Sequence, residues 1–191
     1  KWTVAYWHHA PYTRGGENSD SPRESTDMRA NILPILEQGG TDLVFAGHSH
    51  TYERSFLIDG HYGLASTFNA GTMGEDMTSG RIGAPHAYAK PADPTAHAGT
   101  VYTLCGVSGK KETGTLNHPV MYMSTGAHEG SMVLDVRGDS LNARFINDAG
   151  TVVDYFDIVK PASRLKVAVK MMLEGSYTPL SGMMHDNLRV A

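Results

Sequence analysis

The sequence predicts an α/β fold in which a βαβ unit is followed by an antiparallel β meander. Two observations lead to this prediction. Near the N-terminus, two short apolar runs flank a segment with helical periodicity. In the second half, several short apolar runs follow one another with glycine-containing turns between them. The length of 191 residues is sufficient for one domain with a hydrophobic core.

The first element is expected to be a strand over residues 2–7, because this run is short, aromatic and β-branched. Residues 11–22 are polar and rich in glycine, serine and asparagine, which is typical of a loop. We therefore expect the strand to be followed directly by a long polar loop.

A helix is predicted after this loop. Ser25 or Thr26 can cap its N-terminus, and apolar residues recur at helical spacing as far as Gln38. Pro34 should kink or shorten this helix, and the pair Gly39-Gly40 is a natural C-terminal stop.

Residues 42–46 form a short apolar run, which we expect to be a buried strand. A strand, a helix and a strand in this order predict a parallel pair with a right-handed crossover. Both strands would then end at the same edge of the sheet, where ligands of open α/β sheets bind.

The remaining chain is expected to contain an irregular loop over residues 62–99 and then a series of strands. These strands are predicted over residues 101–107, 120–124, 131–136, 141–146 and 152–159. Pro161 marks a boundary, and a further strand is expected from about residue 165. We therefore predict one domain over residues 1–160, with residues 161–191 as the start of a following segment or module.

Histidines follow both strands of the predicted βαβ unit. His8 and His9 close the first run, and the motif Gly47-His48-Ser49-His50 follows the second. Neutral imidazole is the commonest metal ligand in proteins, and imidazoles that converge from two strand ends suit a first-row metal ion. Neighbouring strand residues point to opposite faces, so only one of His8 and His9 should enter the site unless the loop twists.

Composition excludes some partners. The formal charge of −4 argues against a nucleic-acid surface, which would be basic. No apolar run approaches the ~20 residues that a membrane-spanning helix needs. The single cysteine, Cys105, excludes an internal disulfide framework.

The histidine motifs carry a family resemblance. The segment His8-His9-Ala10-Pro11-Tyr12 and the later Gly47-His48-Ser49-His50-Thr51-Tyr52-Glu53-Arg54 resemble the C-terminal half of a calcineurin-like metallophosphoesterase domain. The most similar branch is the purple-acid-phosphatase-like one, which has Gly-His-x-His-x-Tyr-Glu-Arg. The resemblance implies that residues 1–160 form half of an αββα sandwich whose centre holds two metal ions, of zinc, iron or manganese.

The resemblance also implies roles for the histidines. His8 and His48 would bind one metal ion, and His50 would bind the other. The family histidine usually stands four residues before an aromatic, here Tyr12, which selects His8. The family also often has a proline two residues after the ligand, and that spacing fits His9 instead.

Four further residues are candidates for supporting the site or contacting substrate: His9, Arg14, Tyr52 and Arg54. Arg14 follows the histidine pair and could bind a phosphate bidentately, or it could be a solvated loop arginine. Glu53 and Arg54 could form an ion pair or brace the histidine loop. No catalytic side chain is assigned.

The family's carboxylate-bearing motifs precede its first histidine motif, and none lies ahead of His8. We therefore expect a missing N-terminal half in a longer parent protein, a metal-dependent phosphatase acting on phosphate esters. This fragment alone should be inactive. By resemblance the parent would be secreted or periplasmic. The alternative is a non-catalytic surface or adhesion module on a phosphatase-like scaffold that lacks the carboxylates.

Overall fold

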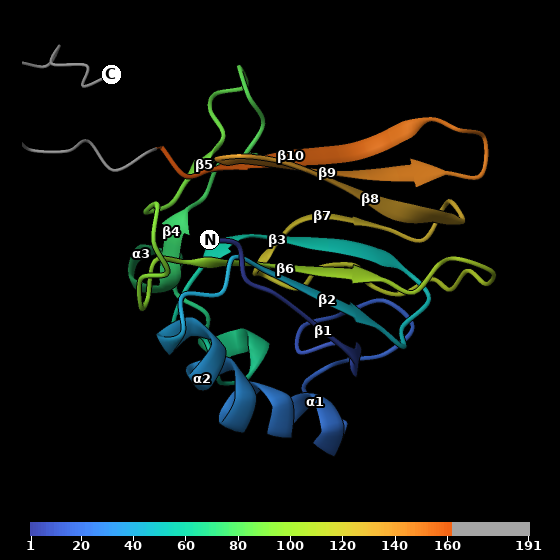
Figure 1. Ribbon diagram of the computed structural model, residues 1–191. Coiled ribbons are helices and arrows are strands. Elements are labelled where there is room, and N and C mark those ends of the chain that lie inside the picture. The colour runs from blue at the N-terminus through green and yellow to red at the C-terminus, as the bar shows by residue number, and fades with distance from the viewer. Residues whose placement is uncertain (162–191) are drawn as a thin grey trace, which may run out of the picture.

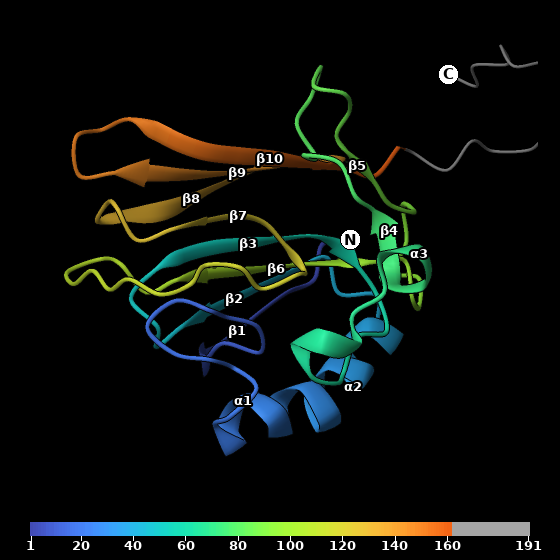
Figure 2. The same cartoon turned by 180° about the vertical axis from the view of Figure 1, so that it is seen from behind.

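The chain folds into three layers, which Figures 1 and 2 show from opposite sides. The structure, a computed structural model, describes residues 1–161. A helical layer covers one face of a six-stranded sheet, and a four-stranded sheet covers the other face. This mixed α/β arrangement is consistent with half of the predicted αββα sandwich. The strand expected from about residue 165 lies outside the described residues.

The larger sheet contains the predicted βαβ unit. Its strands, in spatial order, are β1 (Val4–His9), β2 (Leu43–Gly47), β6 (Thr100–Cys105), β3 (Tyr52–Ile58) and β4 (Gly74–Asp76), and β7 (Met121–Thr125) also pairs with β3. Strands β1, β2 and β6 are parallel to one another. The predicted parallel pair is therefore confirmed, and its two strands end at the same edge.

The smaller sheet contains the antiparallel meander, which is shorter than expected, and a short strand that pairs with it in parallel. Its strands, in spatial order, are β5 (Tyr88–Ala89), β10 (Val152–Val159), β9 (Ser140–Asn147) and β8 (Gly130–Arg137). The prediction holds for β8, β9 and β10, but β6 and β7 belong to the larger sheet. Strand β6 is buried along most of its length, because layers cover it on both faces, as is usual for a parallel strand.

The crossover is one continuous helical segment in three parts: α1 (Arg23–Asp27), the π-helical turn η1 (Met28–Ile32) and α2 (Leu33–Gln38). The predicted cap at Ser25 or Thr26 is wrong, since the helix begins after Pro22. Pro34 is the second residue of α2, directly after the π-helical turn, so the regular α-helical pattern is interrupted next to the proline, where a kink or shortening was predicted. The predicted stop is confirmed, and Gly40 has a φ of +71°. The short helices η2 (Ala65–Thr67) and α3 (Ala70–Met73) lie within the predicted loop.

The buried strand β3 was not predicted from the sequence. Glu53, Arg54 and Ser55 occupy its middle, and charged residues usually indicate an exposed segment. All three side chains are nevertheless buried, because each has partners inside the protein. The charged residues make this segment hydrophilic, and for this reason the sequence did not predict a buried strand here.

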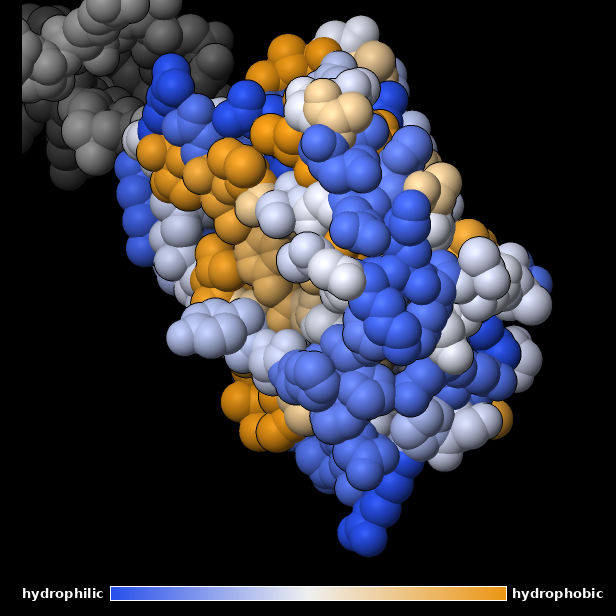
Figure 3. Space-filling view, turned by 90° about the vertical axis from the view of Figure 1, so that its right-hand side faces the viewer, coloured by the Kyte–Doolittle hydropathy of each residue, from blue (hydrophilic) through white to orange (hydrophobic). Residues whose placement is uncertain are grey.

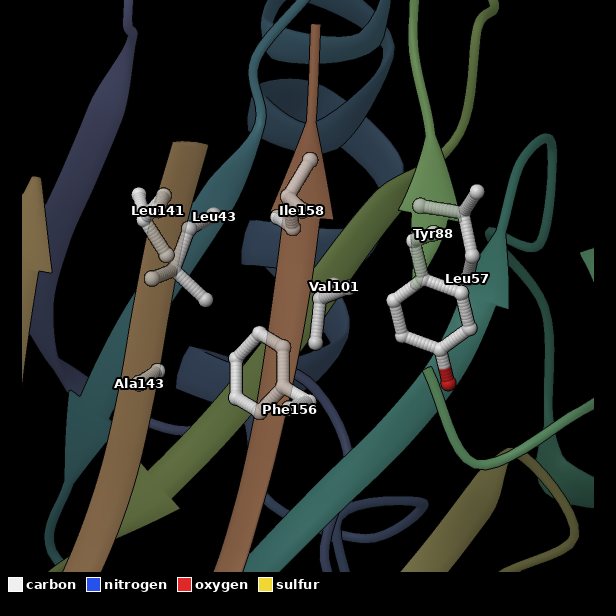
Figure 4. Packing of buried hydrophobic residues seen from close by; sticks show 8 residues of the cluster. All are labelled: Leu43, Leu57, Tyr88, Val101, Leu141, Ala143, Phe156 and Ile158. Carbon is white, nitrogen blue, oxygen red and sulfur yellow. The ribbon is translucent and has the colours of Figure 1, made fainter. Parts of the chain in front are cut away.

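The main core lies between the two sheets. Figure 4 shows eight side chains that meet there from both layers: Leu43, Leu57, Tyr88, Val101, Leu141, Ala143, Phe156 and Ile158. A second cluster fills the space between the larger sheet and the helices. Together these cores fix the strand ends that carry the histidines.

One side of the sandwich has two outer strands, β1 and β8. Trp2, just before β1, donates a hydrogen bond to the carbonyl of Gly138 in the β8–β9 turn, which places the two strands on the same side. Within residues 1–161, no strand pairs with the outer edge of either one.

Apolar side chains on these two strands are exposed although they face the inter-sheet core. Val4 and Tyr6 pair with core-facing residues of β2, and Leu134 and Val136 pair with core residues of β9. Tyr6 is nevertheless 83% exposed, and Val136 is 49% exposed. We call this surface the open side.

Candidate metal centre

Three histidines meet where β1 and β2 end. His8 Nε2 lies 3.0 Å from His48 Nδ1, and the ring centres of His9 and His48 lie 4.4 Å apart. One ring nitrogen from each of the three residues lies within 4.8 Å of the others. Figure 3 views the end of the molecule where these strands finish, and polar side chains cover much of it.

A bulge in β1 explains why both neighbouring histidines approach His48. Tyr6 pairs with Phe45, but the next pair is His9 with Gly47. Strand β1 thus advances three residues while β2 advances two, and an extra residue of this kind redirects the following side chains. The exception to the expectation that only one histidine enters therefore applies, because the register shift brings both side chains near His48.

The residue that follows β2 has an unusual backbone conformation. His48 has a φ of +70°, in the left-handed region that non-glycine residues seldom adopt. Such strain persists where the surroundings determine the conformation, and it is common at functional sites.

The loop after β1 folds over the motif and brings a carboxylate to it. Glu17 Oε1 lies 2.9 Å from His48 Nε2. The adjacent Gly16 N–H donates to the Ser49 hydroxyl over 2.8 Å. Sequence reasoning missed Glu17, and its signal is only its place in the glycine-containing loop that follows the histidine pair.

His50 lies beside a second carboxylate and outside the cluster of three. Its Nδ1 atom is 3.0 Å from Glu112 Oε1, but it lacks a hydrogen-bond partner with good geometry in the part of the chain that the structure describes. The Lys110 ammonium holds the pKa of Glu112 at about 2. Sequence reasoning also missed Glu112, which lies in a loop with no readable pattern.

Buried Glu53 anchors the loop. Its carboxylate accepts hydrogen bonds from the Thr13 and Thr51 hydroxyls and from the Arg14 backbone N–H. Burial raises the pKa of Glu53. These contacts tie the loop after β1 to the start of β3.

Arg54 and Tyr52 point away from the histidines, into the space between the sheets. Arg54 binds Asp154 through Nε at 2.7 Å and Nη2 at 3.1 Å, and the Tyr52 hydroxyl donates to the same carboxylate over 2.8 Å. Of the two alternatives, the pairing of Glu53 with Arg54 is therefore wrong, whereas Glu53 does brace the loop. Consecutive residues of a strand point to opposite faces of the sheet, so Glu53 and Arg54 bind different partners.

Arg14 lies in the loop but is already paired. Its Nη2 atom donates to Asp20 over 2.7 Å, and its side chain is 24% exposed. Arg14 is thus partly buried and held by one ion pair, which engages one of its five N–H donors.

The histidine donors fit a first-row metal ion. Three imidazoles converge, and His50 lies outside this cluster with its Nδ1 atom beside the Glu112 carboxylate. Zinc, iron and manganese accept imidazole together with oxygen ligands. The chemistry of the donor set therefore agrees with a metal centre.

A second group of potential ligands, Glu37, Asp59 and His97, also occurs among the described residues. The Tyr62 and Tyr102 hydroxyls both donate to Glu37. His97 is paired with Asp59. Each of the three residues already has a partner inside the protein, so this group has a structural explanation.

Comparisons with known proteins agree with the predicted resemblance. No family model matches the chain. A segment of 53 residues is 42% identical to "Probable purple acid phosphatase 20" of Arabidopsis thaliana, and covers 28% of this chain and 12% of that protein. None of the helices within residues 1–161 has the length and apolar character that crossing a bilayer requires.

The fold is similar to that of a solved purple acid phosphatase, PPD1 from yellow lupin (Lupinus luteus) seeds. The TM-score is 0.59 with 18% identity, over 83% of this chain and 25% of that chain. GAP50, the anchor in the inner membrane complex of Plasmodium, gives a TM-score of 0.45 with 14% identity, over 80% of this chain and 36% of that chain. This second likeness supports no conclusion. The chain thus spans a small part of the length of its relatives, and its similar segment and its fold resemble those of purple acid phosphatases.

Proposed function

We propose that this chain is the histidine-bearing part of a metal-dependent phosphoesterase that hydrolyses phosphoric esters. The observation that carries the proposal is the approach of His8 Nε2 to His48 Nδ1, at the ends of two parallel strands. Such an approach of two ring nitrogens at a sheet edge suits metal ligation better than a solvated surface.

In this proposal the centre is dinuclear and holds zinc, iron or manganese. His8 and His48 hold one ion, with His9 as the neighbouring alternative, and His50 holds the other. A pair of ions lowers the pKa of water, orients the ester and offsets charge that develops on the phosphoryl oxygens. The chain's own contribution is to hold its imidazoles at the ends of β1 and β2.

The proposal also includes the remainder of the catalytic domain as a partner, which would supply the carboxylate ligands. Two observations support it. The chain spans 25% of the lupin enzyme. The open side leaves core-facing residues such as Tyr6 and Val136 exposed, next to two strand edges that no strand within residues 1–161 pairs with, and an exposed edge can accept a further strand. A secreted or periplasmic location is proposed on the family resemblance.

Phosphatase assays on the longer protein test this proposal. We expect metal-dependent hydrolysis of a chromogenic phosphate monoester or diester, which a chelator abolishes. Residues 1–191 alone should show little turnover. A longer protein that binds metal poorly and hydrolyses neither ester would favour the non-catalytic module instead.

A further inference from the structure

The carboxylate of Glu17 meets His48 on the side of its ring away from His8. His48 Nδ1 faces His8 Nε2 over 3.0 Å, whereas His48 Nε2 faces Glu17 Oε1 over 2.9 Å. The two ring nitrogens of His48 therefore have different surroundings, one imidazole nitrogen and one carboxylate oxygen.

We propose that Glu17 is a positioning residue for the metal centre. A carboxylate only accepts hydrogen bonds, so in the neutral ring it places the proton of His48 on Nε2. The Nδ1 lone pair then faces His8 and is available to a metal ion. A hydrogen bond from the second ring nitrogen of a ligand to a carboxylate fixes the tautomer and makes the ligand more basic.

The loop holds Glu17 in this position. Gly16 N–H donates to the Ser49 hydroxyl over 2.8 Å, directly beside His48. Gly15 N–H donates to the Thr13 hydroxyl over 3.0 Å, and Thr13 in turn donates to buried Glu53. The Gly16–Ser49 and Thr13–Glu53 contacts tie the loop to the segment that carries His48, and the Gly15–Thr13 contact lies within the loop, so the position of Glu17 follows from the fold around it.

The alternative is an ordinary surface pair. The side chains of His48 and Glu17 are 34% and 38% exposed, and exposed pairs contribute little to stability. The two explanations differ in what they predict, because a surface pair would influence neither the tautomer of His48 nor the affinity for a metal ion.

The inference rests on the proposed metal centre, but its test involves no hydrolysis. The ¹⁵N NMR shifts of His48 in the metal-free chain report which ring nitrogen carries the proton. We expect the Nε2–H form in the wild type and a mixture of the two forms in Glu17→Ala. Glu17→Gln should retain part of the preference, because its amide oxygen can still accept the hydrogen bond.

Zinc affinity, measured by competition with a chromogenic chelator, provides the second readout. Glu17→Ala should weaken zinc binding by about 10–100-fold, the usual effect of losing such a partner. Glu17→Gln should weaken it less. Glu24→Ala, which removes an exposed carboxylate from helix α1, is the matched control and should leave zinc affinity unchanged.

The inference is overturned if His48 carries its proton on Nδ1 in the wild type. It is also overturned if the wild type binds no zinc, or if Glu17→Ala and Glu24→Ala give the same zinc affinity. Circular dichroism of each variant confirms that the comparison is between folded proteins. Phosphatase assays on the longer protein remain a separate test, so failure of the proposed function is distinguishable from failure of this inference.

Discussion

Two halves of one continuous motif have different surroundings in this protein. His48 and His50 lie at the sheet edge, where each side chain is about one third exposed. Tyr52 and Arg54, only a few residues later, are fully buried between the sheets. In the first half, His48 presents a ring nitrogen to His8, whereas in the second half Arg54 forms an ion pair with Asp154.

The difference shows that the motif combines candidate metal ligands with buried residues that hold the strand in place. A polar residue at the strand end can keep a nitrogen for a ligand, whereas a polar residue inside the strand must satisfy its groups within the protein. Glu53 connects the two halves, because it faces the loop over the histidines while its neighbour Arg54 faces the second sheet. Substitutions in the two halves should therefore affect different properties.

The largest expected effect is on stability, from Arg54→Met. This change leaves Asp154 buried with only a partial set of partners, which typically costs about 3–5 kcal/mol. Urea unfolding measures the loss. Arg137→Met is the matched control, because Arg137 is 81% exposed in its pair with Asp135, and it should cost less than about 1 kcal/mol. An equal loss of unfolding free energy in both variants would contradict the difference between the buried ion pair and the exposed one.

His48→Ala should have the opposite effect, with a large loss of function and little loss of stability. In the longer protein it should lower phosphatase activity and the affinity for one metal ion by at least about 100-fold, more than the loss of an outer partner of a ligand. Its free energy of unfolding should change by less than about 0.5 kcal/mol, as for other exposed sites. His86→Ala, at an exposed histidine paired with Asp76, is the control. Full activity in His48→Ala would contradict the assignment.

Acid should lower the stability of the chain by protonating two histidines, His61 and His118. Both are buried, in contrast to the histidines at the strand ends. Burial lowers the pKa of His61 to about 4 and that of His118 to about 3, and both rings pack around Tyr12. The unfolded chain takes up protons near pH 6.5, before the folded chain does. Stability should thus be full above pH 6.5 and decrease progressively toward pH 4.

The urea midpoint of the chain, measured across this range of pH, checks the expectation. Replacing His61 with phenylalanine should flatten the pH dependence. A wild-type midpoint that stays constant between pH 6.5 and 4 would mean that these histidines are not buried in the neutral form.

The smallest expected effect is the difference in metal affinity between variants of His8 and His9, the two neighbours at the end of β1. His8→Ala should weaken metal binding several-fold more than His9→Ala, because His8 Nε2 makes the close approach to His48. Metal titrations of both variants give the order. The reverse order would assign the ligand to His9, whose ring also lies against His48.

The sequence was sufficient to predict the βαβ unit and the gathering of histidines at one edge, because apolar runs and strand-end histidines are local signals. It could not show β3, since Glu53 and Arg54 conceal its burial. It could not show the bulge that brings both His8 and His9 to the site, because register depends on the paired strand. Glu17 and Glu112 come from loops, whose paths over the histidines depend on tertiary contacts.

The central claim is that the ends of β1 and β2 form a metal centre. X-ray absorption spectroscopy of the chain loaded with one equivalent of zinc tests it most directly, because imidazole ligands give a characteristic scattering pattern. We predict a zinc shell that contains imidazoles in the wild type and fewer of them in His48→Ala. A shell of oxygen ligands alone, unchanged in His48→Ala, would contradict the account.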